Sequence, residues 1–565
     1  MKLPPQVGNP LARWRARRLA VSIVAVVAVV TMVLLSWQPV STRIDSARAA
    51  ALKSRVERIY TASYQSKAQS DLVSDRDSES HDQDNIYTKE NPYGTNMTGL
   101  YVYFTTARAA KVSYRVSTPN KSYPDFSATP KGGATYKTTH EFQALGLIPG
   151  KSNTVTITIT YRDGSSYTRT IKHKGASLLG WADMRLTSTK ASSEQNLGDG
   201  LYAILGNDSD GQDFTLLYDK QGVLRAEIPI LYYRSQRLLF DRNGLMWFSA
   251  ATTTMAAMNS LGRLVKIYDL ADKYILHHDY VFDGDQNILI LATDLSRKDQ
   301  TVQDQVVKLN TSTGKVTHVL DLGDLFPSYK KTTKKTGSIY ATKENSRTDS
   351  GTKVRWDWMH INTIQYTDDG SVLLSSRETS TVIKVDDIEG TPSIGYLMGV
   401  SSFWKGTNYA KYSLSKVGDF PDSGGQHSVT YVKDDSLPEG QYYVTMFDNN
   451  YGNSPTRPGF DWSQIDGINT GYMGTYSKYS KYLVDEAKGT YTLVRSFTVP
   501  YSPIVSSVQD LDDGTTLVDS GTKGLFGIYN AKGKLIQQWR IAMQSGNIYR
   551  VYQYDFKGFF FASKA

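Results

Sequence analysis

Apolar and polar positions follow different patterns in three parts of this 565-residue chain. Residues 19–40 carry no charge and are almost entirely apolar, and about 20 such residues suffice to cross a bilayer as a helix. Residues 41–94 are first rich in alanine and charge, then polar and acidic, which predicts a helical stalk followed by a linker. After residue 94, short apolar stretches alternate with turn residues, the pattern of β-strands.

Basic residues precede the apolar segment. Residues 1–18 contain five Lys or Arg side chains, and a basic flank of this kind marks the cytoplasmic side of a membrane helix. We therefore expect a cytoplasmic tail (1–18), a single transmembrane anchor (19–40) in the cell membrane, and an extracellular remainder. A cleaved signal peptide is the alternative, because Ala47-Arg48-Ala49 resembles a cleavage site. That site lies well beyond the apolar run, which favours a retained anchor.

Residues 95–178 show the period-two pattern of strands that are buried on one face. Val155, Ile157 and Ile159 alternate with threonines, so their side chains point to one side of a strand. Turn residues such as Asp163-Gly164 separate this stretch from its neighbours. These signals predict a small β-sandwich domain.

Residues 179–565 repeat two short patterns. In one, an acidic turn precedes an apolar strand, as at Asp368-Asp369-Gly370; in the other, two strands flank a polar turn ending in glycine, as around Gly533. Each pattern recurs about six times, and two hairpins make the four strands of a propeller blade. We therefore predict an all-β protein, a six-bladed β-propeller after the sandwich domain. Five or seven blades remain alternatives.

Composition narrows the classes of partner. The net charge is +9, but the basic residues are scattered apart from the N-terminal tail and a run at residues 330–335 that we interpret as solvated. We therefore expect no nucleic-acid partner. The chain has no Cys, which excludes disulfides, thiolate chemistry and lipidation of cysteine.

Histidines stand at equivalent places in the repeats. The chain has eight, and four lie in three short motifs around residues 277–278, 360 and 427. Four polar residues lie eight positions before the equivalent point of the following turn: His278, Asn362, His427 and Ser506. Because propellers place the innermost strand of every blade around one channel, we expect these side chains to converge near the axis.

Two further residues belong to the same region. His360 lies two positions before Asn362, on the same face of that strand, and Arg377 ends the next strand. Imidazoles with a guanidinium suit a tetrahedral oxyanion, because Arg binds sulfate or phosphate oxygens in a fork and imidazole can attack sulfur or phosphorus or protonate a leaving oxygen. No nucleotide-binding loop or carboxylate cluster for Mg²⁺ is visible, so we expect no cofactor.

Two other interpretations of the histidines remain open. They can line a water-filled channel with a structural role, or three of them can bind zinc with an open position. The sequence has no His-x-His or His-x₃-His pair, and a guanidinium beside a metal is unfavourable. We therefore expect no metal.

The motifs together resemble one family. His277-His278-Asp279, Trp356 to Asn362 with Arg377, Gln426-His427-Ser428 with Asn449-Asn450, and the block around Ser506 are similar to the bacterial arylsulfate sulfotransferases over about residues 95–555. The resemblance implies a six-bladed propeller that moves a sulfuryl group from an aryl sulfate donor to a phenolic acceptor. It implies a ping-pong mechanism through a sulfohistidine, without the nucleotide donor that cytosolic sulfotransferases use. It also implies that the protein can form a homodimer.

The resemblance also implies roles for single residues. His427 would be the nucleophile, His360 and Arg377 would stabilise charge on the sulfuryl oxygens, and His278 would act near the phenolic oxygen. The residues implied to bind substrate are Asn362, Ser506 or Ser507, and Tyr552. Well-known members are soluble periplasmic proteins with a disulfide, whereas this chain has an apparent anchor and no Cys. A surface propeller that only binds ligands, or a hydrolase that passes the group to water, are the alternative functions.

Overall fold

The computed structural model describes residues 46–190, 197–198, 200–207, 212–270, 273–337, 354–544 and 546–563. The protein is mostly β, and its residues from Val56 onward form one compact unit. No helix among these described residues is long and apolar enough to cross a membrane. The predicted anchor, residues 19–40, lies outside them.

A helical segment lies against the β structure. Residues 46–59 are helical, and helix α2 (Ala62–Arg76) follows Thr61, whose hydroxyl accepts a hydrogen bond from the Tyr64 amide as an N-cap. The Tyr60 hydroxyl donates to Pro229 O at 2.8 Å. Leu72 packs with buried tyrosines of the first sheet. Part of the segment predicted as a stalk is therefore packed against the β unit.

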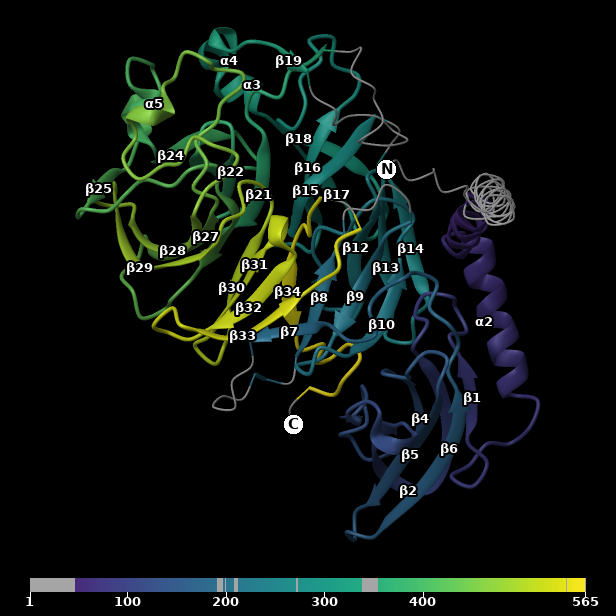
Figure 1. Ribbon diagram of the computed structural model, residues 1–565. Helices are drawn as coiled ribbons and strands as arrows, with labels where there is room; N and C mark the ends of the chain where they lie inside the picture. Colours follow the sequence, from purple (N-terminus) through teal and green to yellow (C-terminus); the bar gives the residue numbers. More distant parts are fainter. Residues whose placement is uncertain are drawn as a thin grey trace, which may run out of the picture. The chain divides into compact units, whose positions relative to one another are not determined.

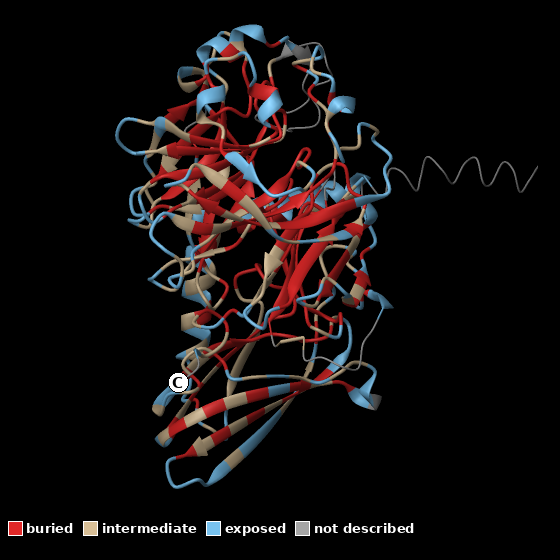
Figure 2. Cartoon of the chain, turned by 90° about the vertical axis from the view of Figure 1, so that its left-hand side faces the viewer, coloured by how far each residue is buried: buried red, intermediate tan, exposed pale blue. Residues whose placement is uncertain are grey.

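The first β domain is a six-stranded sheet. Its strands are β1 (Tyr87–Glu90), β2 (Leu100–Ser117), β3 (Phe126–Ala128), β4 (Lys137–Ala144), β5 (Ser152–Tyr161) and β6 (Ser166–Lys174). Strand β2 pairs with β4 through its first part and with β5 through its second, so all the strands join one hydrogen-bonded sheet. Val155, Ile157 and Ile159 are fully buried, and this alternation shows as coloured bands on the lower strands in Figure 2.

Six sheets of four or five strands follow (Figure 1). The first three contain β8 (Leu201–Leu205), β9 (Phe214–Tyr218), β10 (Leu224–Pro229) and β34 (Val551–Tyr554); β11 (Leu239–Phe240), β12 (Met246–Ala251), β13 (Thr254–Met258) and β14 (Leu264–Asp269); and β15 (Tyr274–Phe282), β16 (Ile288–Asp294), β17 (Gln305–Leu309) and β18 (Val316–Asp321). Acidic turns such as Asp283 to Asn287 close their hairpins, with Asp283 Oδ1 accepting from the Asn287 amide at 2.8 Å.

The other three sheets complete the series. They contain β21 (Ile361–Tyr366), β22 (Val372–Ser376), β23 (Thr381–Asp386) and β24 (Ser393–Gly399); β25 (Ser415–Val417), β26 (His427–Val432), β27 (Gln441–Asp448), β28 (Tyr476–Asp485) and β29 (Thr490–Pro500); and β7 (Thr187–Lys190), β30 (Ser507–Asp510), β31 (Thr516–Ser520), β32 (Leu525–Tyr529) and β33 (Leu535–Arg540). Short connecting elements are α3 (Leu322–Leu325), α4 (Pro327–Thr332), β19 (Thr336–Gly337), β20 (Val354–Arg355) and α5 (Ser401–Trp404).

Two of the sheets combine strands from distant parts of the chain. Strand β34 pairs with β8, with Val551 opposite Ile204, and β7 pairs with β33, with Ser188 opposite Trp539. The first strands of neighbouring sheets also contact one another, β15 with β21, β21 with β26, β26 with β30 and β30 with β34. The residues that begin these strands are therefore brought close together.

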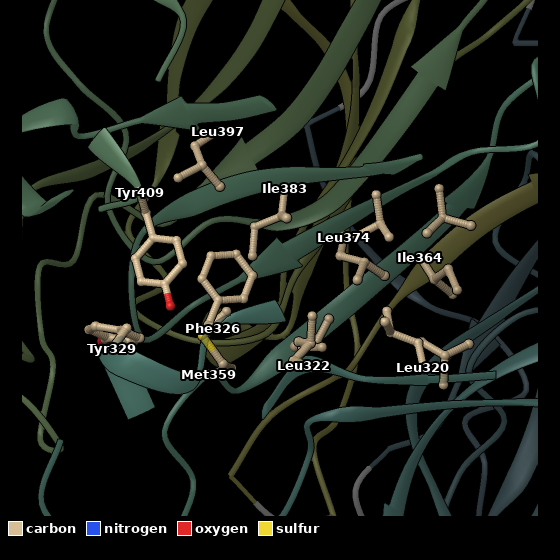
Figure 3. Packing of buried hydrophobic residues seen from close by; sticks show 14 of the residues in the cluster. Leu320, Leu322, Phe326, Tyr329, Met359, Ile364, Leu374, Ile383, Leu397 and Tyr409 are labelled. Carbon is tan, nitrogen blue, oxygen red and sulfur yellow. The ribbon is translucent and has the colours of Figure 1, made fainter. Parts of the chain in front are cut away.

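The third and fourth sheets share a large hydrophobic core. Leu320, Ile364, Leu374 and Ile383 are buried there among aromatic side chains from the connecting helices (Figure 3). Burial of each such aliphatic side chain contributes about 1.5–3 kcal/mol relative to exposure. This packing holds the start of β21 in a fixed position, because Met359 and Ile361, on either side of His360, belong to the same core.

Candidate active site

His427 has one nitrogen committed to the protein. Its Nδ1 lies 2.7 Å from Asn449 Oδ1 and 3.0 Å from Gly425 O. The Asn449 amide nitrogen donates to Ser502 O at 2.8 Å and to Val505 O at 3.1 Å, so its oxygen must face the imidazole. Both partners of Nδ1 are acceptors, and Nδ1 therefore carries the proton while Nε2 keeps its lone pair.

His360 is oriented by a buried carboxylate. Its Nδ1 lies 2.6 Å from Asp357 Oδ2. Burial raises the pKa of Asp357 to about 6, and the Arg377 guanidinium opposes that rise. The short bond directs the other imidazole nitrogen away from Asp357, in the arrangement by which a carboxylate can stabilise an imidazolium.

His278 lies beside His360. The two ring centroids are 4.9 Å apart at an interplanar angle of 66°. His278 Nδ1 is 3.0 Å from Nδ1 of His277, so one of these nitrogens carries a hydrogen and the other accepts it. The Tyr549 hydroxyl donates to His278 O at 2.7 Å and fixes the backbone. Three imidazoles from β15 and the start of β21 thus form one group.

All four imidazoles of this region are held neutral. Burial lowers the pKa of His427 and of His277 to about 3, and it lowers the pKa values of His278 and His360 well below the usual value. Arg377 and Arg550 lower the pKa of His427 further. A neutral imidazole keeps the lone pair that a nucleophile or a base requires.

Strained backbone aims these side chains. His278, His360, Ser428 and Ser506 have φ values of 52°, 47°, 53° and 87°, a region that non-glycine residues rarely occupy. The strand registers shift between Leu276 and Tyr280 and between His427 and Thr430. Such bulges re-aim side chains near active sites, and here they turn polar residues out of the regular strand alternation.

Two guanidinium groups make the site cationic. Arg377 contacts Glu378 through Nη2 at 3.2 Å, and Arg550 is fully buried with Nη1 2.9 Å from Asp279 Oδ1. Asp279 also accepts two bonds from Arg237, at 2.7 and 2.8 Å, so one carboxylate balances two cations. Within the described residues, neither Arg377 Nε nor Arg550 Nε has a hydrogen-bond partner. Both guanidinium groups act electrostatically on His427, and each has an N–H group that can donate to an anion.

The predicted substrate-binding residues make hydrogen bonds within the protein. Asn362 Nδ2 donates to Gln426 O at 2.8 Å, which ties β21 to the residue before His427. Ser506 Oγ donates to Ser502 Oγ at 2.9 Å, and Ser507 Oγ donates to Val551 O at 3.0 Å. The Tyr552 hydroxyl lies 3.0 Å from Ser428 Oγ. These hydrogen bonds tie together the strands that carry the site.

Several residues that shape the site had no predicted role. Asn449, Asp357 and Arg550 are the clearest examples. Asn449 lies 22 residues after His427, and no local pattern indicates that pairing. Asp357 lies three residues before His360, a spacing that could have marked it as a partner. Within the described ranges no three His, Cys, Asp or Glu side chains are placed to hold a metal ion.

Comparison with known families decides the assignment. Residues 186–558 match the model of the arylsulfotransferase (ASST) family, and residues 87–176 match that of the arylsulfotransferase Ig-like domain. The chain belongs to the arylsulfotransferase family. The first β domain is thus the Ig-like domain of the family. The six later sheets lie in the region that matches the arylsulfotransferase model.

Other comparisons are weaker. Among curated proteins there is no match. A protein of unknown function from Bacteroides caccae aligns at 11% identity and TM-score 0.35, over 63% of this arylsulfotransferase and 98% of that chain. A protein from Lactobacillus plantarum aligns at 10% identity and TM-score 0.35, over 79% and 99%. Virginiamycin B lyase from Staphylococcus aureus aligns at 8% and TM-score 0.31, over 64% and 90%. These scores are too low to carry any argument.

Proposed function

We propose that the protein transfers a sulfuryl group from an aryl sulfate ester to a phenol through a covalent intermediate on His427 Nε2. One observation carries the proposal: Asn449 and Gly425 hold the proton on Nδ1 of His427, so a neutral Nε2 is left beside the guanidinium groups of Arg377 and Arg550. A lone pair next to an anion site is the arrangement that attack on a sulfate ester requires.

The first half of the proposed reaction sulfates the enzyme. The Nε2 lone pair attacks sulfur, the N–S bond forms, and the bond between sulfur and the aryl oxygen breaks to release a phenolate. Arg377 and Arg550 stabilise the sulfuryl oxygens. The phenolate leaves without a proton, because neutral His360, whose Nδ1 hydrogen faces Asp357, has only a lone pair on its other nitrogen. The neutral Asn449 amide cannot remove the Nδ1 proton, so the sulfated ring stays cationic and remains a good leaving group.

The second half reverses these steps with a new phenol. The phenolic oxygen attacks sulfur, its proton passes to a neutral imidazole of His360 or His278, and the N–S bond breaks to restore the lone pair on His427. The protonated imidazole then gives its proton to the released phenolate or to solvent, which returns the site to its starting state. Asp357 supports His360 when that ring becomes protonated, because the two groups are 2.6 Å apart. The mechanism is ping-pong, since one nitrogen serves the donor and then the acceptor.

We extend the proposal to architecture and location. The six successive sheets, with β34 closing onto β8, support a six-bladed propeller over about residues 179–565, after the domain at 95–178. The charge-free segment 19–40 and its basic flank support a single-pass protein of the cell membrane with its catalytic part outside. Residues 41–94 would connect the two, and a homodimer would be compatible with this placement.

The test uses purified full-length protein, para-nitrophenyl sulfate and phenol. We expect nitrophenolate release that rises with phenol, phenyl sulfate as the second product, and parallel lines in double-reciprocal plots. The His427→Ala variant should retain less than about one-thousandth of kcat/KM, because the covalent route is lost. Mass spectrometry of enzyme quenched after donor alone should find one SO₃ group on a peptide containing His427.

Other outcomes separate the alternatives. Release that is rapid without phenol and unchanged by it would indicate a hydrolase. No release from folded protein that still binds aryl sulfate would indicate a binding module. Full activity in His427→Ala would refute the assignment of the nucleophile. Thr430→Ala, on the same strand β26, is the matched control and should keep wild-type kinetics.

A further inference from the structure

Exposed apolar side chains gather in one loop of the sheet that carries His427. Tyr472, Met473 and Tyr476 are 55%, 79% and 38% exposed, and they lie between β27 and the start of β28. Single exposed apolar residues are common, but several in one short loop mark a binding surface. The loop follows Asn449, the residue that orients the nucleophile.

The loop is held in one shape by hydrogen bonds. Asn469 Nδ2 donates to the Tyr501 hydroxyl at 2.6 Å and to Gly471 O at 2.5 Å, and Tyr501 donates to Gly471 O at 2.8 Å. Gly474 approaches so closely that a Cβ there would lie 2.6 Å from the Tyr501 ring. The exposure of Tyr472 and Met473 is therefore a property of an ordered loop.

Two tyrosines of this region form an open corner. The ring centroids of Tyr451 and Tyr472 are 6.0 Å apart with an interplanar angle of 86°. Tyr451 follows Asn449 by two residues and is partly buried, whereas Tyr472 is 55% exposed. A planar ring placed in such a corner can stack on one tyrosine and meet the other edge-on, which are the two favourable aromatic geometries.

The corner adjoins the reactive groups. The Tyr451 amide donates to Gly424 O at 3.0 Å. A Cβ on Gly425 would lie 2.8 Å from Tyr451 O and 3.8 Å from Arg377 Cγ. Tyr451 and Arg377 therefore both lie next to Gly425, which has no side chain to keep them apart. Burial raises the pKa of the Tyr451 phenol, and the Arg377 guanidinium opposes that rise, which places the two groups within electrostatic reach.

From this geometry we propose that Tyr451, Tyr472 and Met473 form an aromatic-ring subsite that holds the aryl group of the donor and afterwards the ring of the phenolic acceptor. The proposal rests on the proposed sulfuryl transfer. With the sulfate at Arg377 and His427, an attached ring is directed toward the tyrosine corner, and the flexible thioether of Met473 can adapt to rings of different size. Because the same nitrogen reacts with both substrates, one subsite serves both.

Steady-state kinetics test the subsite. Tyr472→Ala should raise KM about three- to tenfold for both para-nitrophenyl sulfate and phenol, the loss expected for one aromatic contact, with kcat within about twofold of wild type because ground state and transition state lose the contact equally. Naphthyl sulfate and naphthol should show the larger rise. Tyr472→Phe keeps the ring and should keep both KM values.

A matched control and a binding measurement complete the test. Val494→Ala removes an apolar side chain that is 51% exposed on strand β29 of the same sheet, and it should leave KM unchanged. Calorimetry with para-nitrophenyl sulfate should give a Kd three- to tenfold higher for the His427→Ala/Tyr472→Ala protein than for His427→Ala. This measurement needs no turnover, so it tests the subsite even if wild-type protein transfers nothing.

Two results would overturn the subsite. One is an unchanged Kd and unchanged KM values in Tyr472→Ala. The other is an equal rise in Val494→Ala, which would indicate a general effect on the fold. Failure of phenol-dependent transfer with an altered Kd would instead reject the proposed reaction and keep the aromatic subsite as a ligand site.

Discussion

A single amide decides which nitrogen of His427 can react. Asn449 accepts from Nδ1 at 2.7 Å while its own NH₂ group is held by two carbonyls. Because these two bonds fix the amide nitrogen as a donor to the carbonyls, only the amide oxygen can face the imidazole, which is therefore confined to one tautomer. Burial lowers the pKa of His427 to about 3, and the hydrogen bond to the neutral Asn449 amide opposes only part of that fall.

Substitution of Asn449 should therefore change the rate and its pH dependence. Asn449→Ala should lower the rate of the donor half-reaction about 10²-fold, because the Nε2 lone pair is no longer enforced. Asn449→Asp should raise the pKa of His427 by placing a negative charge at Nδ1, which moves the acidic limb of the profile to higher pH. A stopped-flow pH series measures both. A loss of rate that parallels the loss of Tm, with an unmoved profile, would assign Asn449 a structural role only.

Glu378 links pH to stability beside Arg377. Burial raises its pKa to about 7, although Arg377 opposes the rise. The folded protein therefore holds this proton more tightly than the unfolded chain. The resulting contribution to the free energy of unfolding is fully present below about pH 4.5 and is lost as pH rises through about 7. A pKa shift of this size corresponds to about 3 kcal/mol in the free energy of unfolding.

The Glu378→Gln variant isolates that effect. Its amide oxygen can still accept from the Thr456 amide and hydroxyl, as Glu378 Oε1 does at 2.7 and 2.6 Å. We expect the free energy of unfolding of the variant to rise relative to wild type between pH 5 and pH 8, measured by denaturant titration at each pH. A difference that is constant across this range would show that Glu378 does not titrate there.

At the scale of elements, strand β34 completes the first sheet and brings Arg550 to the site. Leu205 N donates to Arg550 O at 3.0 Å, and Val551 N donates to Ser507 Oγ at 3.1 Å, so the segment joins two sheets. Without it, β8 would present a row of unpaired backbone groups.

Truncation after Asn547 should therefore lower Tm by about 10 °C or more and promote aggregation through the exposed edge of β8. Differential scanning calorimetry and light scattering measure these effects. Protein lacking only Lys564 and Ala565 is the control and should behave as wild type. A peptide of residues 548–563 added in trans should restore part of the stability, and a truncated protein as stable as the control would refute the role of β34.

The elements were predictable to the extent that their signals are local. Acidic turns and Gly turns predicted hairpins such as β21–β22, which Asp368-Asp369-Gly370 joins, because the turn residues act within a few positions. The pairing of β34 with β8 and of β7 with β33 has no such local signal. The long strand β2, which joins all strands of the first domain into one sheet, was likewise not evident from alternation alone.

The same limit applies to the site across the whole molecule. The eight-residue spacing predicted that His278, Asn362, His427 and Ser506 converge near one axis. In the structure Asn362, His427 and Ser506 lie at or beside the starts of β21, β26 and β30, whereas His278 lies in the middle of β15. The spacing could not predict side-chain direction, because the bulges and left-handed residues direct Asn362 to Gln426 and Ser506 to Ser502. Nor could it predict Asn449, whose role depends on a tertiary hydrogen bond.

Closure by the last strand also sets an order of events during synthesis. A ribosome makes β8 early and β34 almost last, so a nascent chain carries the histidines long before it carries Arg550 and Tyr549. Until the final residues emerge, the anion site lacks one guanidinium and His278 lacks the hydroxyl that fixes its backbone. Termination of translation before residue 548 would therefore yield a protein in which β8 has no β34 to pair with and the site lacks Arg550.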